Sequence, residues 1–197
     1  MLEIKALTRL HIGPVTLSLA DGEVIAITGP SGSGKSVLLR AIADLDPNTG
    51  NLRTQSGVRA EMSGPVWRRK VAYLPAESGW WADTVAAHFE HPEQADLTSL
   101  GLPPEAMGWE VARLSSGERQ RLAFLRLLER APDVLLLDEP TAPLDAENTA
   151  LFESRLKRCM AAGTSVLLVT HDPAQSARMA ERHFVFSEGQ LRETTHG

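Results

Sequence analysis

The sequence predicts an α/β fold with a mostly parallel sheet, and three observations support this prediction. Short apolar runs rich in β-branched residues alternate with longer segments of helical periodicity. These apolar runs are continuous, which is typical of parallel strands that are covered on both faces. Polar or glycine-rich residues follow three of the runs directly, at the carboxyl ends of strands, where such sheets bind ligands.

The expected elements follow one another in this alternating order. We expect buried strands at residues 23–28, 71–74, 134–137 and 164–170, helices at 35–43, 118–130, 146–162 and 174–181, and a closing hairpin of strands 183–187 and 190–192. Residues 77–113 differ, because strand signals vanish and Pro, Gly, Trp and Ala become frequent. We expect a small helical lobe here, so that one domain has a core at about 1–76 and 127–197 and a lobe at about 77–126.

Composition limits the classes of partner. The net charge of −5 disfavours a nucleic-acid partner, and the run Arg68-Arg69-Lys70 is more often a solvated face. Cys159 is the single cysteine, so no internal disulfide is possible, as in proteins of a reducing compartment. The sequence has neither a signal-peptide pattern nor an apolar run of the ~20 residues that span a bilayer. A role at a membrane would therefore require a partner that spans it.

Residues 29–36 match the phosphate-binding pattern G-x-x-x-x-G-K-[ST] in full. The match follows an expected strand and opens an expected helix, so its backbone N–H groups would face an anion. Lys35 would neutralise phosphate oxygens and Ser36 would bind Mg²⁺, whereas the alternative is a merely flexible loop. The expected nucleotide contacts here are Gly29, Pro30, Ser31, Gly32, Ser33, Gly34, Lys35, Ser36 and Val37.

Two further strand ends carry chemically suggestive residues. Asp138 and Glu139 follow a buried strand, where an aspartate suits Mg²⁺ and a glutamate suits a general base that polarises water. His171 follows another strand and could contact the terminal phosphate and hold the water beside Glu139. Each of these residues taken alone could be an ordinary polar strand end, but the phosphate loop upstream favours the catalytic interpretation.

Residues 114–121 (LSSGERQR) precede the strongest expected helix. Ser115 and Glu118 have the spacing of a capping box, which predicts a helix N-terminus with free N–H groups. The alternative is simply a well-capped helix. The segment also resembles the L-S-G-G-Q signature of ABC ATPases, and the resemblance extends over essentially the whole chain.

That resemblance implies a P-loop NTPase (RecA-like) core with a small antiparallel N-terminal β part and a short helical subdomain. It implies an ATP hydrolase that uses ATP and Mg²⁺, with Ser115, Ser116 and Gly117 contacting nucleotide held by a second subunit. Asp145 lies in a segment similar to the family's D-loop. The catalytic residues would be Glu139, His171 and Lys35.

The resemblance also implies partners. We expect a homodimer or paired ATPase subunit and a separate transmembrane permease subunit. The chain would then be cytoplasmic, peripheral on the inner face of the cell membrane of a bacterium.

The sequence departs from the family pattern at several positions. Ser116 replaces a glycine and Glu118 replaces a glutamine of the signature. Ala76 stands where the family has the Q-loop glutamine, which approaches Mg²⁺ and couples to the membrane partner. We hypothesise that Glu77 replaces it as a metal ligand. No aromatic residue is available near the N-terminus to stack on adenine, so His11 is the candidate, and weaker base selectivity with use of GTP would follow.

Trp80 and Trp81 leave two interpretations open, namely a groove for a membrane partner or ordinary core packing. Three other functions also remain as alternatives. These are a non-transport ABC ATPase, a nucleotide-gated binding module with weak hydrolysis, and a P-loop small-molecule kinase. The kinase would leave residues 114–120 unexplained.

Overall fold

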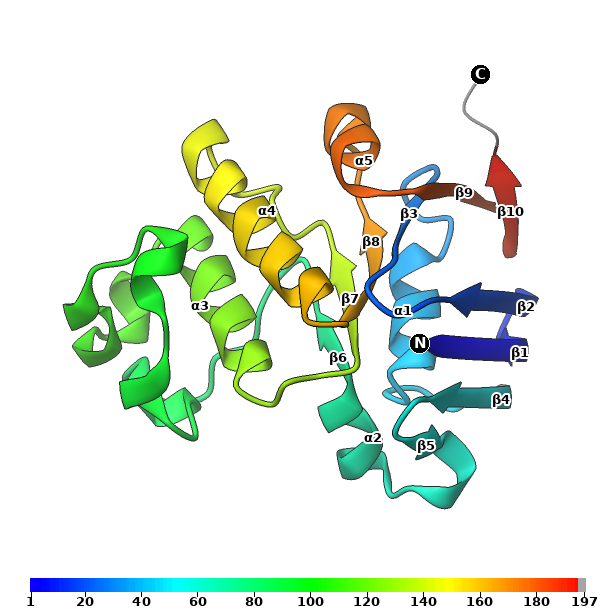
Figure 1. Ribbon diagram of the computed structural model, residues 1–197, viewed down its shortest axis with the longest axis horizontal. Helices are drawn as coiled ribbons and strands as arrows, with labels where there is room; N and C mark the ends of the chain where they lie inside the picture. The colour runs from blue at the N-terminus through cyan, green and yellow to red at the C-terminus, as the bar shows by residue number, and fades with distance from the viewer. Residues whose placement is uncertain (195–197) are drawn as a thin grey trace.

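The structure, a computed structural model, describes residues 1–194, and within this range it contains two β-sheets with helices between and outside them (Figure 1). The larger sheet has the strand order β10-β9-β3-β8-β7-β6, and all its neighbours are parallel except the antiparallel pair β9–β10. This confirms the predicted α/β fold class. Its strands are β3 (Val24–Thr28), β6 (Val71–Leu74), β7 (Val134–Asp138), β8 (Ser165–Val169), β9 (Arg182–Ser187) and β10 (Gln190–Thr194).

The smaller sheet is the antiparallel N-terminal part that the family resemblance implied. Its strand order is β2-β1-β4-β5, and every pair is antiparallel. Strand β2 alternates between buried and exposed side chains, because one face packs on the core and the other faces solvent. The strands are β1 (Leu2–Arg9), β2 (Ile12–Leu19), β4 (Thr49–Thr54) and β5 (Gly57–Val58).

Helices cover both faces of the larger sheet, as continuous apolar strands require. Helix α1 lies between the two sheets, and α3 and α4 lie on the opposite face of the larger one (Figure 1). Alternate side chains of β7 point to opposite faces of the sheet. Leu136 packs in the core cluster that contains α1, and Leu135 packs in the core cluster that contains α3 and α4. The helices are α1 (Lys35–Ile42), α2 (Gly64–Lys70), α3 (Ser116–Leu128), α4 (Ala146–Ala161) and α5 (Pro173–Met179).

Helix α2 was not expected from the sequence. It contains the basic run, of which Arg69 is exposed, and it is anchored by Trp67, which is fully buried and donates its indole N–H to Ile42 O at 2.9 Å. No helix within residues 1–194 is long and apolar enough to cross a bilayer.

The helical lobe expected between residues 77 and 113 is built from short 3₁₀ turns. Between residues 75 and 115 the helical structure consists of short 3₁₀ turns, and no α-helix forms there. Three of these turns begin with a proline or end at a glycine, which keeps them short, because neither residue favours a helix interior. The turns are Ala86–His88, Pro92–Gln94, Leu97–Leu100, Pro104–Gly108 and Val111–Arg113. The following helix, α3, runs across the expected lobe boundary at residue 126.

Candidate nucleotide-binding site

Three strand ends form one edge of the larger sheet. Strands β3, β8 and β7 are direct neighbours and parallel, so their carboxyl ends meet. The phosphate loop follows β3, His171 follows β8, and Asp138 and Glu139 end β7. The topology therefore brings together residues that lie more than a hundred positions apart.

The phosphate loop depends on glycine backbone conformations. Gly29, Gly32 and Gly34 have φ values of 142°, 76° and 102°. A Cβ atom at Gly29 would lie 2.2 Å from Phe186 O, so no residue with a side chain fits at this position. Gly34 is the N-cap of α1 and offers no side-chain cap, and the first turn of α1 has no acidic residue. The first N–H groups of α1 are therefore left for an anion.

Lys35 is nearly buried, and its Nζ donates to Gly29 O at 2.8 Å and to Pro30 O at 2.9 Å. Burial lowers the pKa of this ammonium, and the charges of Glu139 and Asp138 partly offset that shift. The positive charge thus lies on the loop and beside both strand-end carboxylates. Ser36 is exposed at the start of α1, while Val37 packs partly against the core.

Asp138 is held by a residue that the sequence analysis did not single out. This carboxylate is only 4% exposed, and its Oδ2 accepts a hydrogen bond of 2.9 Å from the hydroxyl of Tyr73 on β6. Tyr73 pairs with Leu136, so both side chains and that of Asp138 lie on the same face of the sheet. Burial and then the negative charge of Asp138 raise the pKa of Tyr73 well above its usual range, so the phenol stays a donor. The contact between Tyr73 and Asp138 follows from the register between β6 and β7, which the sequence pattern does not give.

Glu139 and His171 contact each other across the strand ends. The Glu139 Oε1 and His171 Nε2 atoms lie 3.2 Å apart, and Glu139 Oε2 accepts the His171 backbone N–H at 3.2 Å. Glu139 has a φ of 49°, a conformation that is uncommon and strained for a residue other than glycine. Such strain often accompanies functional sites, and here it aims the carboxylate at His171.

The signature segment forms the predicted capping box. Ser115 is the N-cap of α3, and its Oγ accepts the Glu118 backbone N–H while Glu118 Oε2 accepts the Ser115 backbone N–H at 2.8 Å. Ser115 and Ser116 are exposed at this helix N-terminus. A Cβ atom at Gly117 would lie 3.1 Å from Pro143 O, so the glycine allows α3 to pack closely against the segment before Asp145.

Asp145 begins helix α4 as its N-cap and accepts the backbone N–H of Asn148 at 2.8 Å. The Asn148 side chain also accepts from Arg121, whose guanidinium donates to Leu100 O at 2.7 Å. This chain of contacts joins the signature helix to the start of α4. Asp145 itself is exposed.

Ala76 and Glu77 lie beside the signature segment. Both are exposed and line a cavity of about 660 Å³ together with Leu114, Ser116 and Arg119. Within residues 1–194 no hydrogen bond or ion pair joins Glu77 to Ser36 or Asp138. The structure therefore brings Glu77 to the signature segment.

His11 is exposed in the turn between β1 and β2. Its carbonyl packs against Gly189 in the β9–β10 turn, and the next residue, Ile12, contacts the position of Gly34 in the phosphate loop. His11 is thus close in space to the loop. The neighbouring Leu10, 74% exposed, is an apolar surface residue that the sequence analysis did not consider.

Comparison with known proteins identifies the family. The ABC transporter family profile matches residues 12–142 of this chain. The chain is 34% identical to the phosphate import ATP-binding protein PstB 2 of Natronomonas pharaonis, over 91% of this chain and 72% of that protein. It is 35% identical to the aliphatic sulfonates import ATP-binding protein SsuB 1 of Pseudomonas fluorescens, over 97% and 75%.

The chain belongs to the ABC transporter family. It is accordingly an ATP-binding and ATP-hydrolysing subunit of this transporter family. Solved structures agree with the fold of this ABC ATPase. An ATP-binding subunit of an ABC transporter superposes with a TM-score of 0.87 at 24% identity, over 98% of this chain and 89% of that one. A dimeric ATP-binding cassette bound to ADP and phosphate superposes with a TM-score of 0.84 at 23% identity, over all of both chains.

The two tryptophans of this ABC ATPase have different environments. Trp80 packs against the core cluster that contains residues of α3 and α4, so core packing accounts for Trp80. Trp81 is 72% exposed, so core packing does not account for it. Trp81 stacks near Arg126, whose guanidinium carbon lies 4.8 Å from its ring centroid. Trp81 lines a cavity of about 490 Å³, here termed the aromatic–arginine groove, together with Leu45, Arg68, Tyr73, Arg126 and Arg130.

His88 fixes the course of the chain at this groove. Its Nε2 accepts the backbone N–H groups of Trp81 and Ala82 at 2.9 and 3.1 Å, and its Nδ1 lies 2.9 Å from Thr84 O. The ring therefore carries its proton on Nδ1 and packs edge-on against both tryptophans.

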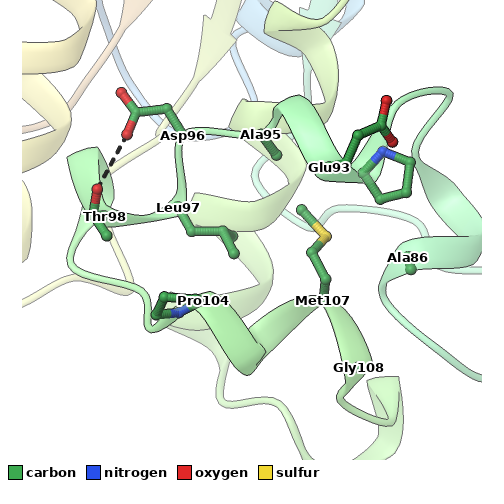
Figure 2. A pocket seen from close by; sticks show the side chains of 10 residues that line it. Ala86, Glu93, Ala95, Asp96, Leu97, Thr98, Pro104, Met107 and Gly108 are labelled. Carbon is green, nitrogen blue, oxygen red and sulfur yellow. Dashed lines mark hydrogen bonds between the residues drawn. The ribbon is translucent and has the colours of Figure 1, made fainter.

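A further cavity of about 510 Å³ lies among the 3₁₀ turns of the ABC ATPase (Figure 2). Leu97 and Met107 project into it, and Thr98 donates to Asp96 at its rim. None of its lining residues belongs to the phosphate loop or to the strand ends that carry Asp138, Glu139 and His171.

Proposed function

We propose that this ABC ATPase hydrolyses two ATP molecules, with Mg²⁺, between two facing ATPase subunits. The observation that carries the proposal is the convergence of the phosphate loop, Asp138, Glu139 and His171 on the ends of three adjacent strands. Positioning and charge stabilisation dominate phosphoryl transfer, so this convergence supplies the groups that the reaction needs.

Within one subunit, the loop from Gly29 to Val37 would bind the phosphates through backbone N–H groups, and Lys35 would neutralise their charge. Glu139 would accept a proton from the attacking water, and His171 would orient both the carboxylate and the water. The 3.2 Å contact between Glu139 and His171 supports these roles, because it limits the rotation of both side chains.

The donor set fits Mg²⁺. The Ser36 hydroxyl and the Asp138 carboxylate are hard oxygen ligands, and Mg²⁺ usually takes only one or two protein ligands beside phosphates and water. The fixed, nearly buried Asp138 supports this assignment. When bound, the ion would neutralise charge on the phosphates. Glu77 remains our candidate for the role of the glutamine that Ala76 replaces.

The second subunit would complete the site. Its Ser115, Ser116 and Gly117 would meet the nucleotide with the positive end of helix α3, which the capping box leaves exposed. Asp145 would link the two sites across the dimer, and His11 would lie against the base. Paired ATPase subunits are consistent with the dimeric cassette of the same fold.

The membrane permease subunit would bind at the aromatic–arginine groove, which makes the ATPase peripheral at the cytoplasmic face of the membrane. The exposed Trp81 and three arginines give this groove the residue types that are enriched at protein interfaces. The groove joins the core, about 1–76 and 127–197, to the lobe at about 77–126. ATP-driven closure would then act on the permease through its different affinity for two states.

Dimerisation provides the test. Glu139→Gln should bind ATP without hydrolysing it, and light scattering with Mg-ATP should show a dimer that dissociates when nucleotide is removed. In the same background, Ser116→Glu should prevent dimerisation, because its charge opposes the phosphates. A Glu139→Gln variant that stays monomeric with saturating Mg-ATP would refute the proposal.

A further inference from the structure

Tyr73 occupies two environments at once. Its hydroxyl donates to Asp138 Oδ2 at 2.9 Å, whereas its side chain is part of the lining of the aromatic–arginine groove. Tyr73 lies on β6, the edge strand beside β7, so a single side chain reaches from the groove to the carboxyl end of β7.

The contact with Tyr73 orients the Asp138 carboxylate. Within residues 1–194, Tyr73 supplies the only side-chain hydrogen bond to this carboxylate. A hydrogen bond to a charged acceptor in a nearly buried site is stronger than one in water, so it sets the orientation of Asp138. Loss of the hydroxyl would release that orientation while leaving the ring in place.

On the groove side, Tyr73 lies among a different set of side chains. Trp81, Arg68 and Arg126 line the same groove, and Trp81 is largely exposed within it. A protein segment seated there would contact the Tyr73 ring. Ala76, three residues further along the chain, has no polar side chain that could carry a signal between groove and site.

We propose that Tyr73 is a positioning residue that couples the groove to the Mg²⁺ side of the nucleotide site by orienting Asp138. The proposal rests on the proposed function, because the groove is taken as the surface for the permease. Coupling of this kind is reciprocal, so Mg-ATP binding must also alter the groove. That reciprocity makes the proposal testable on the full chain without its partner.

The test compares Tyr73→Phe with the wild-type chain. ATP binding is measured by displacement of a fluorescent nucleotide, first in EDTA and then over a Mg²⁺ titration. We expect similar affinity in EDTA but a roughly tenfold higher Mg²⁺ concentration at half-saturation in the variant, from the lost charge-assisted hydrogen bond. Tryptophan emission, with Trp81→Phe as the reference that isolates Trp81, reports the groove. Its change on Mg-ATP binding should be reduced severalfold in Tyr73→Phe.

A matched control exists at the other end of β7. The buried hydroxyl of Thr54 donates to Asp133 at 3.0 Å, just before that strand begins. Thr54→Val removes a hydroxyl–aspartate bond of the same kind, far from the nucleotide site in the register of the sheet. It should lower thermal stability to a similar extent and leave both the Mg²⁺ titration and the Trp81 signal unchanged.

Three outcomes would overturn the proposal. An unchanged Mg²⁺ requirement in Tyr73→Phe would overturn the positioning role, and an unchanged Trp81 response would overturn the coupling. An identical Mg²⁺ shift in Thr54→Val would also overturn it, since the effect would then be general destabilisation. A wild-type chain that binds no Mg-ATP would instead refute the proposed function itself.

Discussion

Glu139 and His171 lie at the ends of adjacent parallel strands, with Oε1 and Nε2 3.2 Å apart. Glu139 Oε2 also accepts the His171 backbone N–H, so both carboxylate oxygens face His171. The pair therefore acts as one unit, and substitutions within it should not be additive.

A double-mutant cycle tests this unit. Glu139→Gln should lower ATP turnover by roughly 10²–10⁴-fold, because an amide cannot accept the proton from water. His171→Ala should also lower turnover, and the double variant should lose little more than Glu139→Gln alone. Phosphate release from the wild type, the two single variants and the double variant gives the coupling free energy between Glu139 and His171. If the double variant loses turnover by the product of the two single losses, the two residues do not share a role. Glu105→Gln, at an exposed position, serves as the control.

Lys35→Ala should weaken ATP binding by roughly 10-fold or more, because the variant loses the nearly buried charge that we propose neutralises the phosphates. Displacement of a fluorescent nucleotide measures the affinity. The exposed Lys157→Ala, on the far helix α4, should bind ATP normally. Equal affinity for Lys35→Ala and wild type would show that this lysine does not contact the phosphates.

The cap of helix α3 should depend on pH through the Glu118 carboxylate. Burial raises the pKa of Glu118, but hydrogen bonds from the Ser115 N–H and hydroxyl outweigh it, and the net pKa is lowered from 4.5. The carboxylate therefore stabilises the fold above about pH 4.5, and this contribution is lost as the pH falls through the lower folded value.

Substitution of Glu118 by Gln tests the cap without removing it, since glutamine also fits a capping box. Urea unfolding at pH 7 should show the variant less stable by about 0.5 kcal/mol, the range of a charge at a helix N-terminus. The difference should shrink below pH 4.5. A difference that is constant over this range would contradict the assigned pKa direction.

The two neighbouring tryptophans form a natural matched pair. Trp80→Ala should lower the free energy of unfolding by about 2 kcal/mol or more, because its ring packs against the core. Trp81→Ala should cost only about 0.5–1 kcal/mol, mainly from its contact with Arg126. Urea unfolding measures both. Co-purification with the membrane subunit should suffer in Trp81→Ala, and equal stability losses would contradict the assignment.

Glu77→Ala tests the replacement for the missing glutamine. If Glu77 supplies the metal contact, the variant should require more Mg²⁺ for ATP turnover, by roughly tenfold for one lost charged ligand. Phosphate release over a Mg²⁺ titration measures this. The neighbouring Ser78→Ala, which leaves the carboxylate in place, is the control. Unchanged Mg²⁺ dependence and turnover would exclude the role.

Local patterns predicted most of the fold. The strand at 71–74 matches β6 at both ends, and the hairpin turn at Glu188-Gly189 forms with positive φ at both residues. The phosphate loop and the capping box depend on residues within eight positions of one another, so their geometry is local. Residues 77–113 form short 3₁₀ turns within the expected helical lobe, and prolines or glycines delimit three of these turns.

The sequence by itself determined the alternating strands and helices, the phosphate loop and the signature cap, because each arises from neighbours along the chain. Only the tertiary structure decided that Tyr73 holds Asp138, that Trp81 is exposed while Trp80 is packed, and that Glu77 faces the signature segment. Those relations depend on strand register and on packing between distant segments. Side-chain partners across a sheet are set by which strands become neighbours, and no local pattern encodes that choice.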